Sequence, residues 1–148
     1  MKKIVACILA VCMLISGMAV FAANTEILIN GERATIAEGM GSIVEKDWRT
    51  FVPVRFALEY FGFQVSWIEK DQMVFGANAD GEMFVMQVGS NFLFFKDKDN
   101  NEKKVEMDVA PFLNNEEGRT YIPLRFLAEV LEYQVGYDEA TSTVTLDK

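Results

Sequence analysis

Two stretches of the chain are near copies of each other, and this repetition limits the possible folds more than any other feature. The stretches are Arg49–Val65 and Arg119–Val135, which start 70 residues apart. Self-similarity at a fixed spacing indicates that a chain is built from related units. We therefore predict two related halves, at about residues 24–76 and 82–148.

Each copy predicts a strand, a short helix and a strand pair. A β-rich run meets a proline, whose fixed φ and missing N–H suit the first turn of a helix, so we predict helices beginning at Pro53 and Pro123. Apolar residues then recur at i, i+3, i+4 and i+7, which gives each helix an apolar stripe. Gly62 should end the first helix in a left-handed conformation, whereas Glu132 replaces it in the second copy, so that helix should end differently or run slightly longer.

A β-hairpin should precede each of these units. Asn30-Gly31 is the favoured type I′ turn, and Asn100-Asn101 lies at the equivalent place. Glu82–Val88 predicts one further strand without a counterpart. Together these elements predict an α+β domain made of two tandem repeats, each with a β-hairpin, a short α-helix and a β-strand pair. We expect mostly antiparallel sheet with the helices on one face, and the two repeats packed about a pseudo-twofold axis. We expect four residues to be central to the core: Phe61, Val65, Leu131 and Val135.

The N-terminus has the three parts of a secretory signal peptide. Lys2 and Lys3 precede an uncharged apolar run, and small residues follow it. We predict a signal peptide at residues 1–22, with cleavage after Ala22 or alternatively after Ala23, and a domain at 23–148. An uncleaved membrane anchor is the other interpretation, because the run is just long enough to span a bilayer. Cleavage would leave a protein that is secreted or associated with the cell wall, without membrane contact.

Composition excludes several kinds of chemistry. The chain has no histidine, and its two cysteines, Cys7 and Cys12, fall within the predicted leader. Thiol nucleophiles, Ser-His-Asp triads and His- or Cys-ligated metal sites are therefore excluded from the mature chain. The formal net charge is −8, and loss of Lys2 and Lys3 would make it −10, so we expect no nucleic-acid partner. We predict no enzyme activity, no cofactor and no metal.

Four arginines recur at equivalent positions of the two copies: Arg49, Arg55, Arg119 and Arg125. Arg55 and Arg125 each precede a glutamate by four residues, which favours an intrahelical ion pair. Arg49 and Arg119 could hold backbone carbonyls of the neighbouring half. Binding of an anionic ligand is the alternative for all four arginines.

The aromatic residues allow a glycan-stacking or protein-binding surface. Trp48 is the best candidate for an exposed aromatic side chain, because it lies outside the alternation of the strands. Trp67 and Tyr137 share a strand face with Val65 and Val135, which predicts that they belong to the core.

Acidic residues copy part of a calcium-binding loop. Asp97, Asp99, Asn101 and Asp108 stand at positions 1, 3, 5 and 12 of such a loop, but Glu102 occupies the position that requires glycine. An ordinary polar hairpin turn is the favoured interpretation.

The segment Glu117–Glu129 with Val135–Asp138, and less completely Trp48–Trp67, resembles the copper amine oxidase-like N-terminal domain family, also called stalk domains. This resemblance covers nearly all of the predicted mature chain. It implies an exported, non-catalytic α+β domain, typically from Gram-positive bacteria. The copper and quinone cofactor of the oxidases belong to a different domain and are not implied here. Trp48 and Glu132 replace glycines of the family pattern, so the turns should differ between the halves.

These observations favour a secreted, non-catalytic binding or scaffold module of the bacterial cell envelope that contacts a cell-wall polymer or an envelope protein. The alternative is a carboxylate-based enzyme acting on cell-wall glycans, or an accessory glycan-binding module, because two carboxylates suffice for glycoside hydrolysis. The 22 acidic residues supply candidate pairs by chance and single out none.

Overall fold

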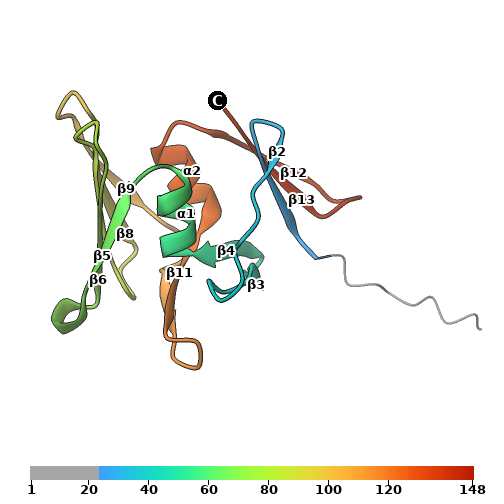
Figure 1. The fold of residues 1–148 in the computed structure, drawn as a ribbon, viewed down its shortest axis with the longest axis horizontal. Coiled ribbons are helices and arrows are strands. Elements are labelled where there is room, and N and C mark those ends of the chain that lie inside the picture. The colour runs from blue at the N-terminus through green and yellow to red at the C-terminus, as the bar shows by residue number, and fades with distance from the viewer. Residues whose placement is uncertain (1–23) are drawn as a thin grey trace, which may run out of the picture.

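A computed structural model describes residues 24–148 (Figure 1). The predicted signal peptide, its cleavage site and both cysteines lie outside these residues. Within residues 24–148, no helix combines the length and the apolar character needed to cross a membrane. The described chain is mostly β-sheet with two short helices, which agrees with the predicted α+β class.

Thirteen strands and two α-helices follow one another along the described chain. The first part contains β1 (Glu26–Ile29), β2 (Glu32–Arg33), β3 (Val44–Lys46), β4 (Arg49–Pro53), α1 (Val54–Tyr60), β5 (Gln64–Ile68), the 3-10 turn η1 (Glu69–Asp71) and β6 (Met73–Ala77). The second part contains β7 (Met83–Gln87), β8 (Phe92–Lys96), β9 (Glu102–Glu106), β10 (Phe112–Asn114), β11 (Arg119–Pro123), α2 (Leu124–Val130), β12 (Gln134–Asp138) and β13 (Thr143–Asp147). The run β4-α1-β5-β6 lies 70 residues before the run β11-α2-β12-β13.

The strands form three sheets, and each sheet joins the two parts of the chain. The sheet orders are β12-β13-β1-β2, β10-β11-β4-β3 and β5-β6-β7-β8-β9. All pairings are antiparallel except that of β1 with β13, which is parallel. The strand predicted at Glu82–Val88 exists as β7 and stands between β6 and β8 in the third sheet. The first sheet has no such inserted strand, because β13 pairs directly with β1.

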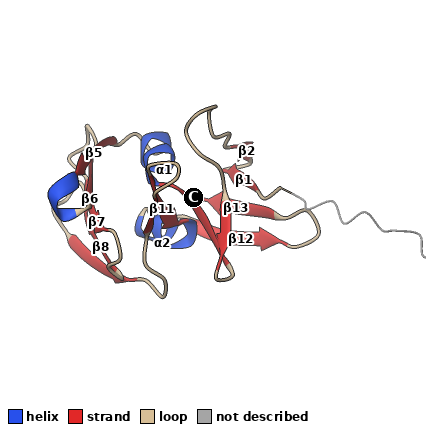
Figure 2. Ribbon diagram, turned by 90° about the horizontal axis from the view of Figure 1, so that it is seen from below, coloured by secondary structure: helices blue, strands red, loops and turns tan. Residues whose placement is uncertain are grey.

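Both helices lie between the first and third sheets rather than on one face of a single sheet (Figures 1 and 2). The prediction of helices on one face was therefore wrong. Helices of seven residues are marginal alone, and burial against several sheets supplies the packing that holds them. Helix α1 buries Val54, Phe56, Ala57 and Leu58, whereas Tyr60 in its last turn is exposed.

The helices begin one residue later than predicted. Pro53 and Pro123 have ψ angles of 124° and 119° and are the last residues of β4 and β11. These two strands pair with each other in the second sheet, β10-β11-β4-β3. The fixed φ of proline, here −57° and −63°, suits the last residue of a strand as well as the first turn of a helix. The chain turns helical only at Val54 and Leu124.

The two helices end in the same way, which corrects the prediction that Glu132 ends α2 differently. Gly62 has φ +84° and Glu132 has φ +65°. The N–H groups of Gly62 and Phe63 donate to Glu59 and Leu58, and those of Glu132 and Tyr133 donate to Glu129 and Ala128, as in a Schellman motif. Trp48, with φ +59°, likewise matches the left-handed Gly118 at φ +63°. Glutamate and tryptophan therefore adopt the backbone angles of the glycines that they replace.

The core differs from the predicted centre. Leu131 is buried, but Phe61, Val65 and Val135 are only half-buried at its margin. The side chains with the least exposure come from the central strands and the helices: Phe51, Val52, Leu58, Phe84, Leu93, Tyr121, Ile122, Leu127 and Leu146. The predicted residues lie at helix ends and on the outer strands β5 and β12, where fewer neighbours cover them.

Candidate functional site: two equivalent grooves

Two grooves are lined by residues at equivalent positions of the two parts. Groove 1 has a volume of about 480 Å³ and groove 2 of about 240 Å³. Ten residues of groove 1 are matched, 70 positions away, by ten of groove 2. The matched pairs, with the groove 1 residue first, are Pro53/Pro123, Val54/Leu124, Arg55/Arg125, Val65/Val135, Ser66/Gly136, Trp67/Tyr137, Val74/Val144, Gly118/Trp48, Arg119/Arg49 and Thr120/Thr50.

Each groove combines an apolar base with arginine and aromatic side chains. Helix α1 or α2 supplies the base with its first turn, and β5 or β12 supplies valine and the aromatic residue. The second arginine comes from the start of β4 or β11. Concave apolar surface with a few polar groups is typical of ligand sites, and arginine with an aromatic ring suits ligands that carry both anionic groups and flat apolar faces.

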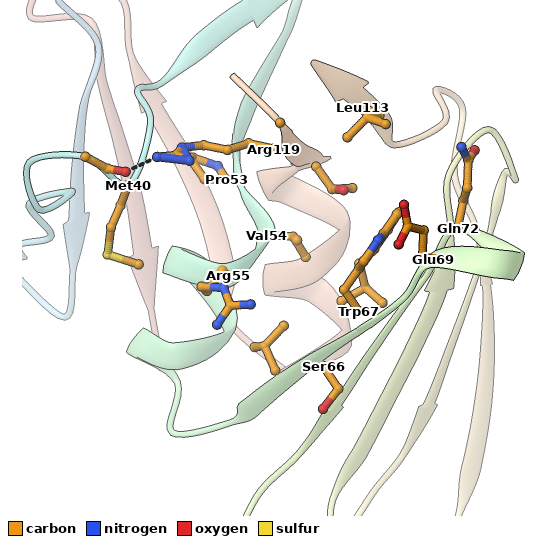
Figure 3. Close-up of a pocket in the computed structure, with 15 residues that line it drawn as sticks. Met40, Pro53, Val54, Arg55, Ser66, Trp67, Glu69, Gln72, Leu113 and Arg119 are labelled. Carbon is orange, nitrogen blue, oxygen red and sulfur yellow. Dashed lines mark hydrogen bonds between the residues drawn. The ribbon is translucent and has the colours of Figure 1, made fainter. Parts of the chain in front are cut away.

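In groove 1, Arg119 is held by the chain itself. Its guanidinium donates to the carbonyl oxygen of Gly39, and Figure 3 shows it turned toward the 39–40 loop, with Trp67 and Glu69 on the opposite wall. Beside it, a Cβ on Gly41 would lie 2.8 Å from Pro53 Cγ and 2.9 Å from the hydroxyl of Tyr121, so the loop approaches as closely as only glycine allows. Groove 1 therefore has a preformed wall.

The Tyr121 hydroxyl fixes the loop below groove 1. It donates to the Glu117 carboxylate and accepts a hydrogen bond from the Ser42 N–H at 3.4 Å. Burial, and then the bond to Glu117, raise the pKa of Tyr121, so the phenol stays protonated and keeps donating.

In groove 2, Arg49 and Arg125 differ in their partners. Arg49 forms an ion pair with Asp108 and donates to the Trp48 carbonyl at 3.1 Å, and the hydrogen bond and charge of Asp108 raise the pKa of Arg49. Arg125 is exposed and forms no ion pair or hydrogen bond with residues 24–148. Its predicted bond to Glu129 is absent among these residues, whereas Arg55 does pair with Glu59 at 3.6 Å.

Within the described part of the chain, each groove thus contains one arginine without a carboxylate partner. These are Arg119 in groove 1 and Arg125 in groove 2. The four arginines do not converge at one place; they divide two and two between the grooves. An anionic ligand group would therefore find an uncompensated guanidinium in either groove despite the acidic composition of the protein.

Trp48 stands at the rim of groove 2 and is 97% exposed. It follows Asp47 in the two-residue turn that joins β3 to β4, and both residues have positive φ, of +59° and +50°. Such a type I′ turn favours glycine at its second position. The indole contributes no packing in return, so the fold does not explain why tryptophan stands here.

Trp67 and Tyr137 are exposed at 38% and 54%, which corrects the prediction that they are core residues. They do share the inward strand face with Val65 and Val135, since Trp67 pairs with the buried Val74 and Tyr137 with the buried Val144. They lie near the ends of their strands, beyond the seven-residue helices, so their rings line the grooves instead of being covered.

The acidic residues of the described chain lie at the surface. Within residues 24–148, no aspartate or glutamate is buried, and no cluster of three potential metal-ligating side chains is present. Asp97 accepts hydrogen bonds from the side-chain amide of Asn101, from the Asn101 N–H and from the Asp99 N–H, and these bonds lower the pKa of Asp97. Asp108 forms an ion pair with Arg49. The residues proposed as an alternative calcium loop therefore serve a hairpin turn and an ion pair.

Sequence reasoning found the arginines and aromatic residues but not their grouping. Thr50, Thr120, Glu45 and Leu113 also line the grooves, and nothing in their spacing alone distinguished them. The sequence feature that indicates two equivalent sites is the spacing of 70 residues between Arg55 and Arg125. The pairing of β4 with β11 then brings the start of each strand beside the helix of the other part.

Comparison with known proteins gives one match. The family model described as the copper amine oxidase N-terminal domain matches residues 28–146. In copper amine oxidases this domain is non-catalytic. No curated protein and no solved structure matches the chain.

Proposed function

Because the chain belongs to the copper amine oxidase N-terminal domain family, we propose that it acts as a secreted, non-catalytic binding module of the bacterial cell envelope. Its ligand in this proposal is a cell-wall glycan that carries acidic groups. The predicted signal peptide supports export, and the two grooves with their uncompensated arginines support binding of an anionic polymer. An envelope protein is the other partner class that the sequence favoured, and it is one outcome of the tests below.

The observation that carries the proposal is the placement of Trp48. A fully exposed indole in a left-handed turn costs stability, and it lies in the same groove as Arg125 and Tyr137. Aromatic rings stack on the apolar faces of sugars, while a free guanidinium binds carboxylate or phosphate groups. Groove 2 therefore offers both kinds of contact to one repeating unit of an acidic glycan.

The proposal includes an internal duplication of the chain. Elements 70 residues apart, with matching left-handed positions at Trp48/Gly118, Gly62/Glu132, Gln72/Ser142 and Asn30/Asn100, support two tandem repeats packed about a pseudo-twofold axis. Two related grooves would then bind successive segments of a polymer, and the second binding event would gain from the first.

The experiment is retention on insoluble cell walls. Purified protein is mixed with walls that keep their acidic polymers and with walls stripped of them, and the bound fraction is measured. We expect strong retention on the first and weak retention on the second, falling with added salt because exposed charges are screened. Equal retention on both, or none on either, would sink the acidic-glycan proposal, and recovery of one protein with the walls would favour the protein partner.

Two substitutions locate the binding in groove 2. Trp48→Gly copies Gly118 of the equivalent turn, and Arg125→Gln removes the free charge; each should weaken retention by about tenfold, as expected for a lost contact of about 1.4 kcal/mol. Arg33→Gln is the matched control, because Arg33 is an exposed arginine that pairs with Glu26 outside groove 2. If Arg33→Gln weakens retention as much as Arg125→Gln, groove 2 is not the site.

A further inference from the structure

The outer face of the sheet β5-β6-β7-β8-β9 is mostly apolar over its middle strands β6, β7 and β8, and its apolar side chains are partly to half exposed. Residues that alternate with the buried ones point outward, because side chains alternate across a strand. This apolar outer face consists of Ile68, Met73, Phe75, Ala77, Met83, Val85, Phe92 and Phe94. Phe94 is 50% exposed and Ile68 44% exposed. Antiparallel sheets with one solvated face normally alternate apolar and polar residues. Gln64, Ser66 and Gln87 also point outward here, but the outward residues of β6 are all apolar.

The fold itself does not require these apolar residues. The strand β13 lies 70 residues after β6 and has Thr145 and Asp147 where β6 has Phe75 and Ala77, while Thr143, at the place of Met73, is buried. The same kind of strand therefore forms with a polar outer face. Contiguous exposed apolar surface marks an interaction site.

The charges on this face favour a second copy of the chain as its occupant. Four charged side chains point outward from the sheet, at one edge of the apolar outer face: Lys96, Glu102, Lys104 and Glu106. They sum to zero, whereas the whole chain has a formal net charge of −8. Two identical acidic molecules can approach through this neutral face without the repulsion that other faces would cause. Lys104 already lies over the Phe92 ring, with Nζ 3.8 Å from its centre.

The shape of the face is also suited to itself. Along one row across the strands, Phe75 pairs with Val85 and Val85 with Phe94, so a smaller residue on the central strand β7 stands between two phenylalanines. A twofold axis along β7 would set Phe75 of one copy beside Phe94 of the other, with the rings on either side of the two valines. Sheets that pack face to face interdigitate in this way.

We propose that two copies of the protein associate through the apolar outer face. Five strands of five residues cover roughly 24 Å by 17 Å, which is small for a specific interface. The dimer is therefore in exchange with the monomer and forms as concentration rises. It leaves groove 2 open, because none of the residues that line groove 2 belongs to this sheet.

Sedimentation velocity over a wide concentration range tests the proposal. The purified protein should shift from monomer to dimer as its concentration rises. The double substitution Phe75→Thr with Phe94→Thr should remove the shift, and Phe75→Thr copies the residue found at Thr145. Thermal melts show whether the variant is folded. Should it fail to fold, Val85→Lys alone carries the test, since it places a charge at the centre of the face.

Leu28→Thr is the matched control. Leu28 points outward from the first sheet beside Thr145, so its loss removes apolar surface elsewhere on the molecule. This variant should dimerise as the wild-type chain does. A wild-type chain that stays monomeric at the highest concentration, a Val85→Lys variant that still dimerises, or a Leu28→Thr variant that no longer does so would each overturn the proposal.

Discussion

Trp48 adopts a backbone conformation that costs an L-residue roughly 1–2 kcal/mol, while its side chain is almost fully exposed. Glycine occupies the equivalent turn at position 118 with nearly the same φ. We therefore expect Trp48→Gly to raise the free energy of unfolding by about 1 kcal/mol. Urea denaturation measures this change. A variant that is less stable than the wild type would show that Trp48 serves the fold, and the argument for a binding role would fail.

Gly41 is the opposite case, a position at which only glycine fits. It has φ +100°, and an added Cβ would meet Pro53, Tyr121 and Arg119 at 2.8, 2.9 and 3.0 Å. Gly41→Ala should lower the free energy of unfolding by about 2 kcal/mol, because it combines overpacking with a disfavoured φ. Gly39→Ala is the control, since its φ is also positive but a Cβ there meets nothing within 4 Å. Equal losses for both variants would mean that the close approach at Gly41 contributes nothing.

At the scale of elements, local patterns predicted what local physics decides. The short helix that follows each proline, the apolar stripe of each helix and the turn at Asn30-Gly31, where both residues have positive φ, follow from short-range sterics and burial. The end of α2 was predicted wrongly because Glu132 was weighed by propensity alone. Two Schellman hydrogen bonds and the burial of Leu131 fix the left-handed position there, whichever residue occupies it.

The ion pair between β9 and the end of α2 makes stability depend on pH. Lys103 donates to Glu132 at 2.9 Å, and this bond and charge lower the pKa of Glu132 below its ordinary value of 4.5. A carboxyl group with a lowered folded-state pKa stabilises the fold above its unfolded pKa, and this contribution is lost as pH falls through the folded pKa. The melting temperature of Lys103→Gln should lie below that of the wild type at neutral pH, and the two should converge as pH falls through this range.

Lys70→Gln is the charge-matched control for this pair, because Lys70 is exposed on η1 and contributes nothing to the lowered pKa of Glu132. It should show no such convergence. A gap between Lys103→Gln and the wild type that persists unchanged at acidic pH would contradict the role assigned to Glu132.

At the scale of the whole molecule, each sheet contains strands from both parts of the chain. The sequence analysis did not predict this sharing of strands. The hairpin β1-β2 joins β12-β13, while β7, β8 and β9 join β5-β6. Pairing between strands that are far apart in sequence depends on which apolar faces meet, and spacing within one strand does not record it. The same exchange explains why the four arginines divide between two grooves: strand β4 passes beside α2, and β11 beside α1.

This exchange predicts that neither part folds alone. Residues 24–80 would lack the strands that complete β1 and β6, and residues 81–148 would lack those that complete β7 and β13. Each fragment, expressed separately, should show no cooperative thermal transition by circular dichroism, and mixing them should restore one. A cooperative transition in either isolated fragment would contradict the shared sheets.

Binding of an acidic glycan at Trp48 in groove 2 is the central proposal for the whole molecule. The chain has two tryptophans, so the emission of the Trp67→Phe variant reports Trp48 alone. Soluble acidic fragments of the cell wall are titrated into this variant while its emission spectrum is recorded. Binding predicts a saturable shift to shorter wavelength, because the ligand removes the exposed indole from water, and no shift when neutral fragments of equal length are used. Emission that stays unchanged at concentrations at which intact walls retain the protein would contradict the claim.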